Sequence, residues 1–194
     1  LAAVRVVSLP GSGTLTLAAN EQIGNLTSTN TSPGSTAQVV LGSFTLTMGD
    51  ATDTTFPGVI SGTGNLIKTG TGNLTLAGVN TYTGTTTVSQ GTLSIAPDGN
   101  STAAVLNGSG AGLVTVSSAA TLAGSGTVNS AVTVATNATL SPGIAGTNSG
   151  VGKLTLNGDL SISGTLVADI KGTTAGTDYD QLAVTGSVTL SSAT

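Results

Sequence analysis

The chain has 194 residues, of which 29 are Gly, and only 6% are charged, against about 25% in an average globular protein. It contains no Cys, no His and no Trp, and its formal net charge is −4. These features exclude a disulfide framework and a thiolate site, remove the commonest general base and metal ligand, and leave no basic patch for a nucleic-acid backbone.

The composition favours β-strands over disorder or helix. The mean hydropathy of +0.35 is too high for a disordered chain. Gly, Thr, Ser, Asn and Val are weak helix formers, and no stretch has the apolar spacing of a helix face. Thr and Val fit a pleated surface, and no apolar run approaches the ~20 residues of a membrane helix. The chain begins with Leu1 and shows no signal-peptide pattern, so we interpret it as a mature form or an excised segment.

Short alternating segments recur along the chain. Leu or Val occupies every second position with Thr between, which in a strand places the aliphatic residues on one face and Thr on the other. The clearest segments are Thr14–Leu17, Phe44–Thr47, Val114–Val116, Val132–Val134 and Leu154–Leu156. Each predicts a strand with one buried and one solvated face.

These segments are evenly spaced. The sequence GTGNL occurs at Gly62–Leu66 and again at Gly70–Leu74. Further along, an aliphatic residue recurs every six positions, at Val116, Leu122, Val128, Val134 and Leu140. This spacing predicts a β-solenoid with roughly three short strands per coil, about 18–24 residues per coil and ~8–10 coils. With only 2% aromatic residues, a narrow aliphatic core is easier to fill than the wide core of a β-sandwich.

The segment Gly62–Ala96 carries a more specific pattern. It contains paired Gly-x-Gly-x-Leu turns, a Lys-x-Gly step at Lys68, the turn Asn80–Gly84, and the strand start Gly91–Leu93. In these motifs the segment resembles the passenger-associated repeat of bacterial autotransporters.

The resemblance extends to two later segments. Leu122–Gly143 and Gly172–Leu190 are similar to the coils that usually follow this repeat. The resemblance implies an all-β, right-handed parallel β-helix exported to the bacterial cell surface. We accordingly expect residues 1–194 to form a single extracellular β-solenoid segment of a longer surface protein, with residues 62–96 as its best-matching repeat.

Two groups of residues are open to a functional or a structural interpretation. Asp178 and Asp180, with Asp169 upstream, could supply oxygen ligands to calcium, but Asp is also a common turn residue. Tyr82 could stack against a sugar or pack at a corner of a coil. We favour the structural interpretation of both.

Asp50 and Asp53 raise the question of an enzyme, because pairs of carboxylates carry out glycoside hydrolysis. In β-helix proteins such sites usually add Arg, Lys or His, and Arg5 is the only basic residue before Lys68. We therefore interpret the two aspartates as turn residues. We expect no catalytic, cofactor-binding or metal-binding residue, no cofactor and no enzymatic activity.

Three functions of different classes fit such a solenoid. The first, which we favour, is a non-enzymatic stalk or adhesin segment with host or surface glycans or proteins as partners. The second is a subunit of an extracellular filament, because open solenoid ends are unpaired strand edges. The third is ice binding through Thr-x-Thr pairs, but these are irregularly spaced, at Thr14/Thr16, Thr45/Thr47, Thr69/Thr71 and Thr81/Thr83. We expect no nucleic-acid partner and no membrane contact by this segment.

Two structural expectations follow from the solenoid register. One buried core should contain Leu122, Val128, Val134 and Leu140, with Thr121, Thr127, Thr133 and Thr139 facing outward, since a one-residue shift exchanges the two sets. Both ends should expose aliphatic core, at Leu1–Val4 and at Val188–Leu190, because neither has the composition of a polar cap. Other copies or adjoining coils of the same protein are the partners expected there.

Overall fold

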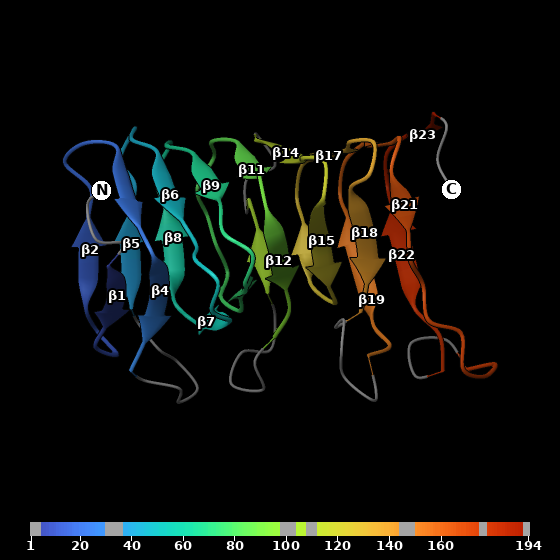
Figure 1. Cartoon of the computed structure of the whole chain (residues 1–194), viewed down its shortest axis with the longest axis horizontal. Helices are drawn as coiled ribbons and strands as arrows, with labels where there is room; N and C mark the ends of the chain where they lie inside the picture. The colour runs from blue at the N-terminus through green and yellow to red at the C-terminus, as the bar shows by residue number, and fades with distance from the viewer. Residues whose placement is uncertain are drawn as a thin grey trace.

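The structure is built from short parallel strands. The computed structural model describes residues 5–29, 37–97, 104–107, 112–143, 150–174 and 178–191. In these residues every regular element is a strand, and all pairings between named strands are parallel. Successive strands wind around one axis from the N-terminal to the C-terminal end (Figure 1). This is the parallel β-helix that the sequence predicts, and none of the described residues form a helix able to cross a membrane.

The first face of the solenoid is one continuous sheet of eight strands. From the N-terminal end these are β3 (Glu21–Ile23), β6 (Leu46–Met48), β9 (Leu66–Lys68), β11 (Thr86–Val88), β14 (Leu113–Val116), β17 (Ala131–Val134), β20 (Leu160–Ile162) and β23 (Val188–Leu190). Because neighbours in this sheet follow one another in chain order, the chain passes this face once in each coil.

The other two faces are each divided into two sheets. The second face consists of β1 (Val6–Leu9) and β4 (Asn25–Ser28), followed by β7 (Thr54–Phe56), β10 (Asn73–Leu76), β12 (Gly91–Ile95), β15 (Ala120–Gly124), β18 (Thr139–Pro142) and β21 (Thr165–Leu166). The third consists of β2 (Thr14–Thr16), β5 (Gln38–Val40) and β8 (Val59–Ser61), followed by β13 (Val105–Leu106), β16 (Thr127–Val128), β19 (Lys153–Leu156) and β22 (Gln181–Val184).

One strand from each face makes a coil, and the eight-stranded sheet defines eight coils in the described residues. The fourth coil has no named strand on the third face, but its backbone still bridges the two sheets there. The N–H of Thr81 donates to the carbonyl of Ile60 at 2.8 Å, and the N–H of Asn80 donates to that of Val105 at 2.9 Å. The stack is therefore continuous across this gap.

Inward side chains form columns that run from coil to coil. Leu122 pairs with Leu140, and Val116 pairs with Val134. The four aliphatic residues predicted to share a core are each at most 1% exposed and belong to one cluster: Leu122, Val128, Val134 and Leu140. The four Thr residues predicted to face outward alternate with them and are half-buried: Thr121, Thr127, Thr133 and Thr139. The predicted register is confirmed.

Outward Thr residues also align between coils. On the first face Thr87 lies beside Thr115, and Thr115 beside Thr133. This alignment is not visible in the Thr-x-Thr pairs of the sequence, because each strand contributes a single Thr to the column. Ile67 interrupts the column between Thr47 and Thr87.

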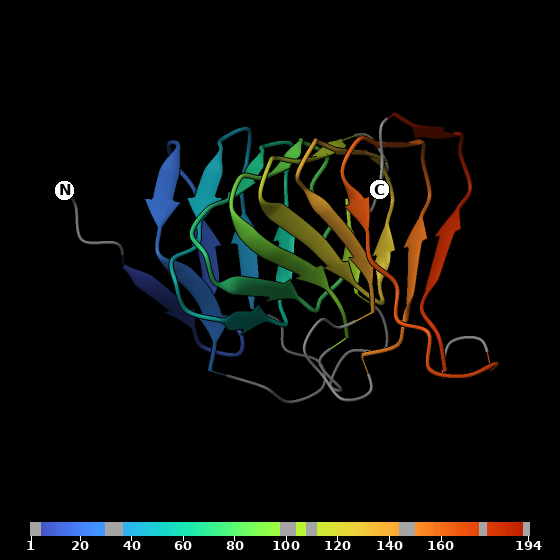
Figure 2. The same cartoon turned by 45° about the vertical axis from the view of Figure 1, so that its right-hand side comes forward.

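The coils differ in length although their strands stay in register. Asn65 and Thr85 occupy equivalent positions in neighbouring coils and are 20 positions apart, whereas Asp159 and Ser187 are 28 positions apart. Some coils are thus longer than the roughly 18–24 residues expected from strand spacing. Much of the extra length lies at one corner, between the second and third faces, after β4, β12, β18 and β21. The segment after β21 extends beyond the stack in Figure 2.

Gly70 shows how closely the coils approach one another at a corner. Its φ is +69°, in the left-handed region. A Cβ atom at this position would lie 2.3 Å from the carbonyl oxygen of Asp50 in the preceding coil. Glycine is required here both for its backbone conformation and for its lack of a side chain.

The register can be tested by placing a charge at inward positions of two strands, β10 and β17, and at an outward position of β17. Leu74→Asp and Val134→Asp should unfold the surrounding coils, since both side chains are 1% exposed and an unpaired buried charge costs several kcal/mol. Thr133→Asp, on the outward side, should change the free energy of unfolding by about 0.5 kcal/mol or less. Urea titration followed by circular dichroism measures the difference, and equal losses in all three variants would contradict the register.

Candidate functional site

The C-terminal end of the solenoid carries an apolar hollow of about 640 Å³. Its lining comes from the last two coils: Leu160, Ile162, Leu166, Leu182, Val184, Val188 and Leu190. Leu160 and Ile162 in β20 are buried, whereas Val188 and Leu190, which continue the same columns in β23, are 53% and 69% exposed. The hollow is therefore the aliphatic core of the solenoid, uncovered on one side.

The backbone at this end is also uncovered. β21, β22 and β23 are the terminal strands of their sheets, so each pairs with a single neighbour among the described strands. The outer edge of such a strand presents N–H and C=O groups that can pair with another strand. The hollow and the edges together form a surface suited to covering by another β-structure.

The N-terminal end is chemically different. In β3, Glu21 occupies the inward column that continues through Leu46 and Leu66, and Glu21 is exposed. The expectation of exposed aliphatic core therefore holds at Val188–Leu190, whereas a carboxylate lies at the start of a core column at the opposite end. Leu1–Val4, on which the expectation for the N-terminal end depended, lie outside the described residues.

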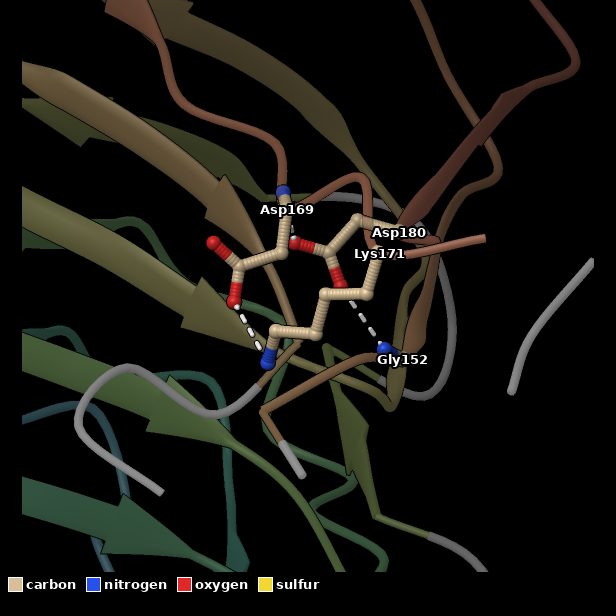
Figure 3. Close-up of polar contacts among 4 residues, drawn as sticks. All are labelled: Gly152, Asp169, Lys171 and Asp180. Atoms are coloured by element: carbon tan, nitrogen blue, oxygen red, sulfur yellow. Dashed lines mark hydrogen bonds and ion pairs between the residues drawn. The ribbon is translucent and has the colours of Figure 1, made fainter. Parts of the chain in front are cut away.

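Asp180 anchors the segment between β21 and β22 (Figure 3). One of its carboxylate oxygens accepts a hydrogen bond from the N–H of Gly152 at 2.8 Å, and the other accepts one from the N–H of Asp169 at 2.9 Å. Asp169 pairs with Lys171 at 3.4 Å, and both of these side chains are about half exposed. Asp180 thus ties the segment to the preceding coil.

The carboxylates of the aspartates considered for calcium are engaged by backbone N–H groups or by Lys171. Hydrogen bonds from Thr174 lower the pKa of Asp178 below its ordinary value, and the Thr174 N–H lies 2.9 Å from its carboxylate. Both carboxylate oxygens of Asp180 bind backbone N–H groups. Within the described ranges, no three acidic side chains are grouped so that they could hold a metal ion. The geometry of Asp169, Asp178 and Asp180 agrees with the turn interpretation.

Asp50 and Asp53 likewise cap backbone groups. The Asp50 carboxylate accepts hydrogen bonds from the N–H and the hydroxyl of Thr52, each at 2.7 Å, and from the amide of Asn25. The hydrogen bonds from Thr52, with a smaller contribution from Asn25, lower the pKa of Asp50. Asp53 accepts from the N–H of Asn73 at 2.7 Å. The two carboxylates therefore bind different partners in different coils.

Lys68 is a buried charge whose burial could not be predicted from its motif. It occupies an inward position between Met48 and Val88 and is 1% exposed. Its Nζ donates hydrogen bonds to three carbonyl oxygens, of Thr69 at 2.6 Å, Gly70 at 2.8 Å and Gln90 at 3.2 Å. Three donors require the protonated amine, so the Lys68 ammonium joins the turns of two successive coils.

Asn80 and Tyr82 are two further buried residues with polar groups in this region. The Asn80 Oδ1 accepts from the N–H of Ile60 at 3.0 Å, and its Nδ2 donates to the carbonyl of Val105 at 3.0 Å, so one side chain joins three successive coils. Tyr82 is fully buried, and its hydroxyl hydrogen-bonds to that of Thr86. Burial raises the pKa of Tyr82. Tyr82 is thus a packing residue, as the sequence interpretation favoured.

These buried polar residues fall in the part of the chain that a known family matches. The model of the passenger-associated-transport-repeat matches residues 66–95, inside the segment 62–96 that the motifs single out. No curated protein matches the chain. The chain thus contains the repeat found in autotransporter passengers, and within it Lys68 and Asn80 join neighbouring coils, while Tyr82 packs in the core.

Lys68→Met should change how stability depends on pH. Burial lowers the pKa of Lys68, and the charges of Asp50 and Asp53 oppose this effect only in part. The folded protein therefore releases this proton at a lower pH than the unfolded chain, in which the ordinary lysine value of 10.5 applies. Between those two pKa values the unfolded state binds more protons, so stability rises with pH.

The free energy of unfolding of the wild-type protein should accordingly increase relative to Lys68→Met as the pH approaches 10.5. Urea titrations across the alkaline range measure this difference. Lys153→Met, at an exposed position in β19, is the matched control. A wild-type-to-Lys68→Met difference that does not vary with pH would contradict a buried ammonium.

Asn80→Asp should destabilise the fold by about 3–5 kcal/mol, because it removes the donor to Val105 and buries a charge. Asn65→Asp is the control. Asn65 is half-buried, and its Oδ1 accepts from the N–H of Thr85 at 2.9 Å, a role that a carboxylate can keep. The Asn65→Asp variant should therefore lose about 1 kcal/mol or less of its free energy of unfolding. Thermal unfolding of both variants measures the contrast, and similar losses would argue against the three-coil role of Asn80.

Proposed function

We propose that this chain is a non-enzymatic segment of an autotransporter-type passenger, a rigid β-helical rod that acts as a stalk or adhesin outside a bacterial cell. The continuity of the eight-stranded sheet from β3 to β23 carries the proposal. Because neighbouring coils share backbone hydrogen bonds and one core cluster, bending at any one coil would break interactions with its neighbours. Such a stack suits a spacer better than a mobile enzyme domain.

The location outside the cell is supported by the passenger-associated repeat at residues 66–95. The composition agrees with this location, because a chain without Cys does not depend on disulfide formation for its stability. Its stability depends instead on stacking and on buried polar contacts such as those of Asn80.

An adhesive role is supported by the outward columns. Thr87, Thr115 and Thr133 align on the first face, and each hydroxyl is both a donor and an acceptor. Such a surface, in a chain with only 6% charged residues, suits hydrogen bonding to neutral glycans or to other uncharged surfaces.

Removal of one complete coil tests the rod. Val116 and Val134 are equivalent positions in neighbouring coils, so deletion of residues 117–134 joins the flanking coils in register. The shortened protein should fold cooperatively, and its length should decrease by about 4.8 Å, the spacing of neighbouring strands. Small-angle scattering and thermal unfolding measure both effects.

Deletion of residues 117–125 is the control, because it removes the second-face strand β15 and places the third-face strand β16 directly after β14, where a second-face strand belongs. This variant should lose cooperative unfolding. If both deletions fold equally well, or both fail, the stack of equivalent coils does not determine the structure as proposed.

The cellular role needs a separate measurement. On intact cells that produce the protein, an antibody against this segment should bind without permeabilisation, and deletion of residues 117–134 should leave that labelling intact. Absence of labelling before permeabilisation would contradict the surface location. Release of reducing sugars from polysaccharides by the purified chain would contradict the non-enzymatic role.

A further inference from the structure

Among the described residues, one asparagine is both exposed and followed by a glycine. Asn157 lies in the bend between β19 and β20, and Gly158 comes directly after it. Asn107 also precedes a glycine in the sequence, but its side chain is fully buried. An asparagine side chain can react with the backbone nitrogen that follows it, and a glycine has no Cβ atom to hinder this approach. Asn157 is therefore the described asparagine best placed for this reaction.

The backbone nitrogen of Gly158 takes no part in the hydrogen bonds of the stack. Asn137 is also exposed, but the N–H of the next residue, Ala138, donates to the carbonyl of Ala135 at 3.0 Å. In the part of the chain that the structure describes, the N–H of Gly158 donates to no acceptor. A nitrogen that donates a hydrogen bond is held in place, whereas an unengaged one is available to act as a nucleophile.

Coil packing requires the glycine at this position. The N–H of Asn157 donates to the carbonyl of Val128 in the preceding coil at 2.8 Å, which brings the two backbones close together. A Cβ atom at Gly158 would lie 2.6 Å from the carbonyl carbon of Ser130 in that coil. Any other residue would therefore displace the neighbouring backbone. The reactive Asn–Gly pair is thus a consequence of how the coils stack at this corner.

One hydrogen bond restrains the Asn157 side chain. Its Nδ2 donates to the Oδ1 of Asn129 at 2.8 Å, and Asn129 lies in the preceding coil, whereas Gly158 follows along the chain. The side-chain amide must leave this contact before its Cγ can meet the Gly158 nitrogen. We propose that Asn157 is a site of spontaneous deamidation and that the hydrogen bond to Asn129 limits its rate. The inference is independent of the function proposed above, because it concerns a reaction of the purified chain with water.

Water is the only other reactant that this modification needs. The Gly158 nitrogen loses its proton to solvent and forms a bond to the Cγ of Asn157, while the Cγ–Nδ2 bond breaks and the Nδ2 group leaves as ammonia with a proton from solvent. Water then opens the resulting cyclic imide at either of its carbonyl carbons. One product is an aspartate with the ordinary backbone, and the other is an isoaspartate whose main chain passes through Cγ. Both products place a carboxylate beside Asn129.

Peptide mapping of the aged chain tests the site. The purified protein is kept at mildly alkaline pH and then digested with trypsin, which cleaves after Lys153 and Lys171 and releases a peptide in which Asn157 is the only Asn or Gln. Mass spectrometry should show this amide turning into a carboxyl group, partly as isoaspartate, while Asn137 keeps its amide. An unaged sample corrects for conversion during digestion. If the folded chain keeps the Asn157 amide while the chain unfolded in urea loses it, the proposal is overturned.

Two substitutions of Asn129 test the restraint on the rate. Asn129→Ala removes the acceptor and should raise the rate of conversion at Asn157 about threefold or more. Asn129→Asp is the matched control, because its carboxylate keeps an oxygen that can accept from Nδ2, and it should not raise the rate. Circular dichroism before ageing establishes that both variants are folded. An unchanged rate in Asn129→Ala, or an equal increase in both variants, would overturn the proposed role of Asn129.

Discussion

The solenoid depends on one constraint, which is that a coil can bury its inward residues only against the coils before and after it. Three short strands enclose too little space to exclude water by themselves. Stability therefore requires inward residues to align along the axis, as Leu122 does with Leu140 and Val134 with Ile162. The same alignment brings backbones together at the corners, where positions such as Gly70 have no room for a side chain. Sequence spacing, core packing and turn composition all follow from this requirement.

The passenger-associated repeat adds buried polar contacts to a core that is mostly aliphatic. Lys68, Asn80 and Tyr82 are each at most 1% exposed, and each has a hydrogen-bond partner. Buried polar groups cost free energy unless they are satisfied, so Lys68 and Asn80, whose partners lie in neighbouring coils, favour one alignment of the coils over displaced ones. Aliphatic columns alone do not distinguish alignments well, because Leu, Val and Ile can replace one another. The buried polar contacts of the repeat thus specify how neighbouring coils are aligned with each other.

The aliphatic periodicity was sufficient to predict the fold and the register from Val116 to Leu140, because inward residues recur there at a constant step. The turn roles of Asp50, Asp53, Asp178 and Asp180 also agree with the structure, since Asp favours turns. The burial of Lys68 was not predictable, because a lone charge in a Gly-rich segment is normally solvent-exposed. Nor was the inward position of Glu21, because β3 lacks the alternation of the later strands. The exposure of Val188 and Leu190 was anticipated from the composition of that end, whereas the difference between the two ends required the register.

The corner between the second and third faces has a consequence for how such a protein can change. Coils of 20 and 28 residues share the same stack because their strands stay in register while the connections that follow strands such as β12, β18 and β21 differ in length. When both ends of a loop are fixed, lengthening the loop changes the free energy of folding only slightly. This corner is therefore a natural grafting point, where a foreign peptide or epitope can be inserted repeatedly, one per coil, at nearly regular spacing. The rest of the coil would serve as an unchanging scaffold on which the displayed sequences vary.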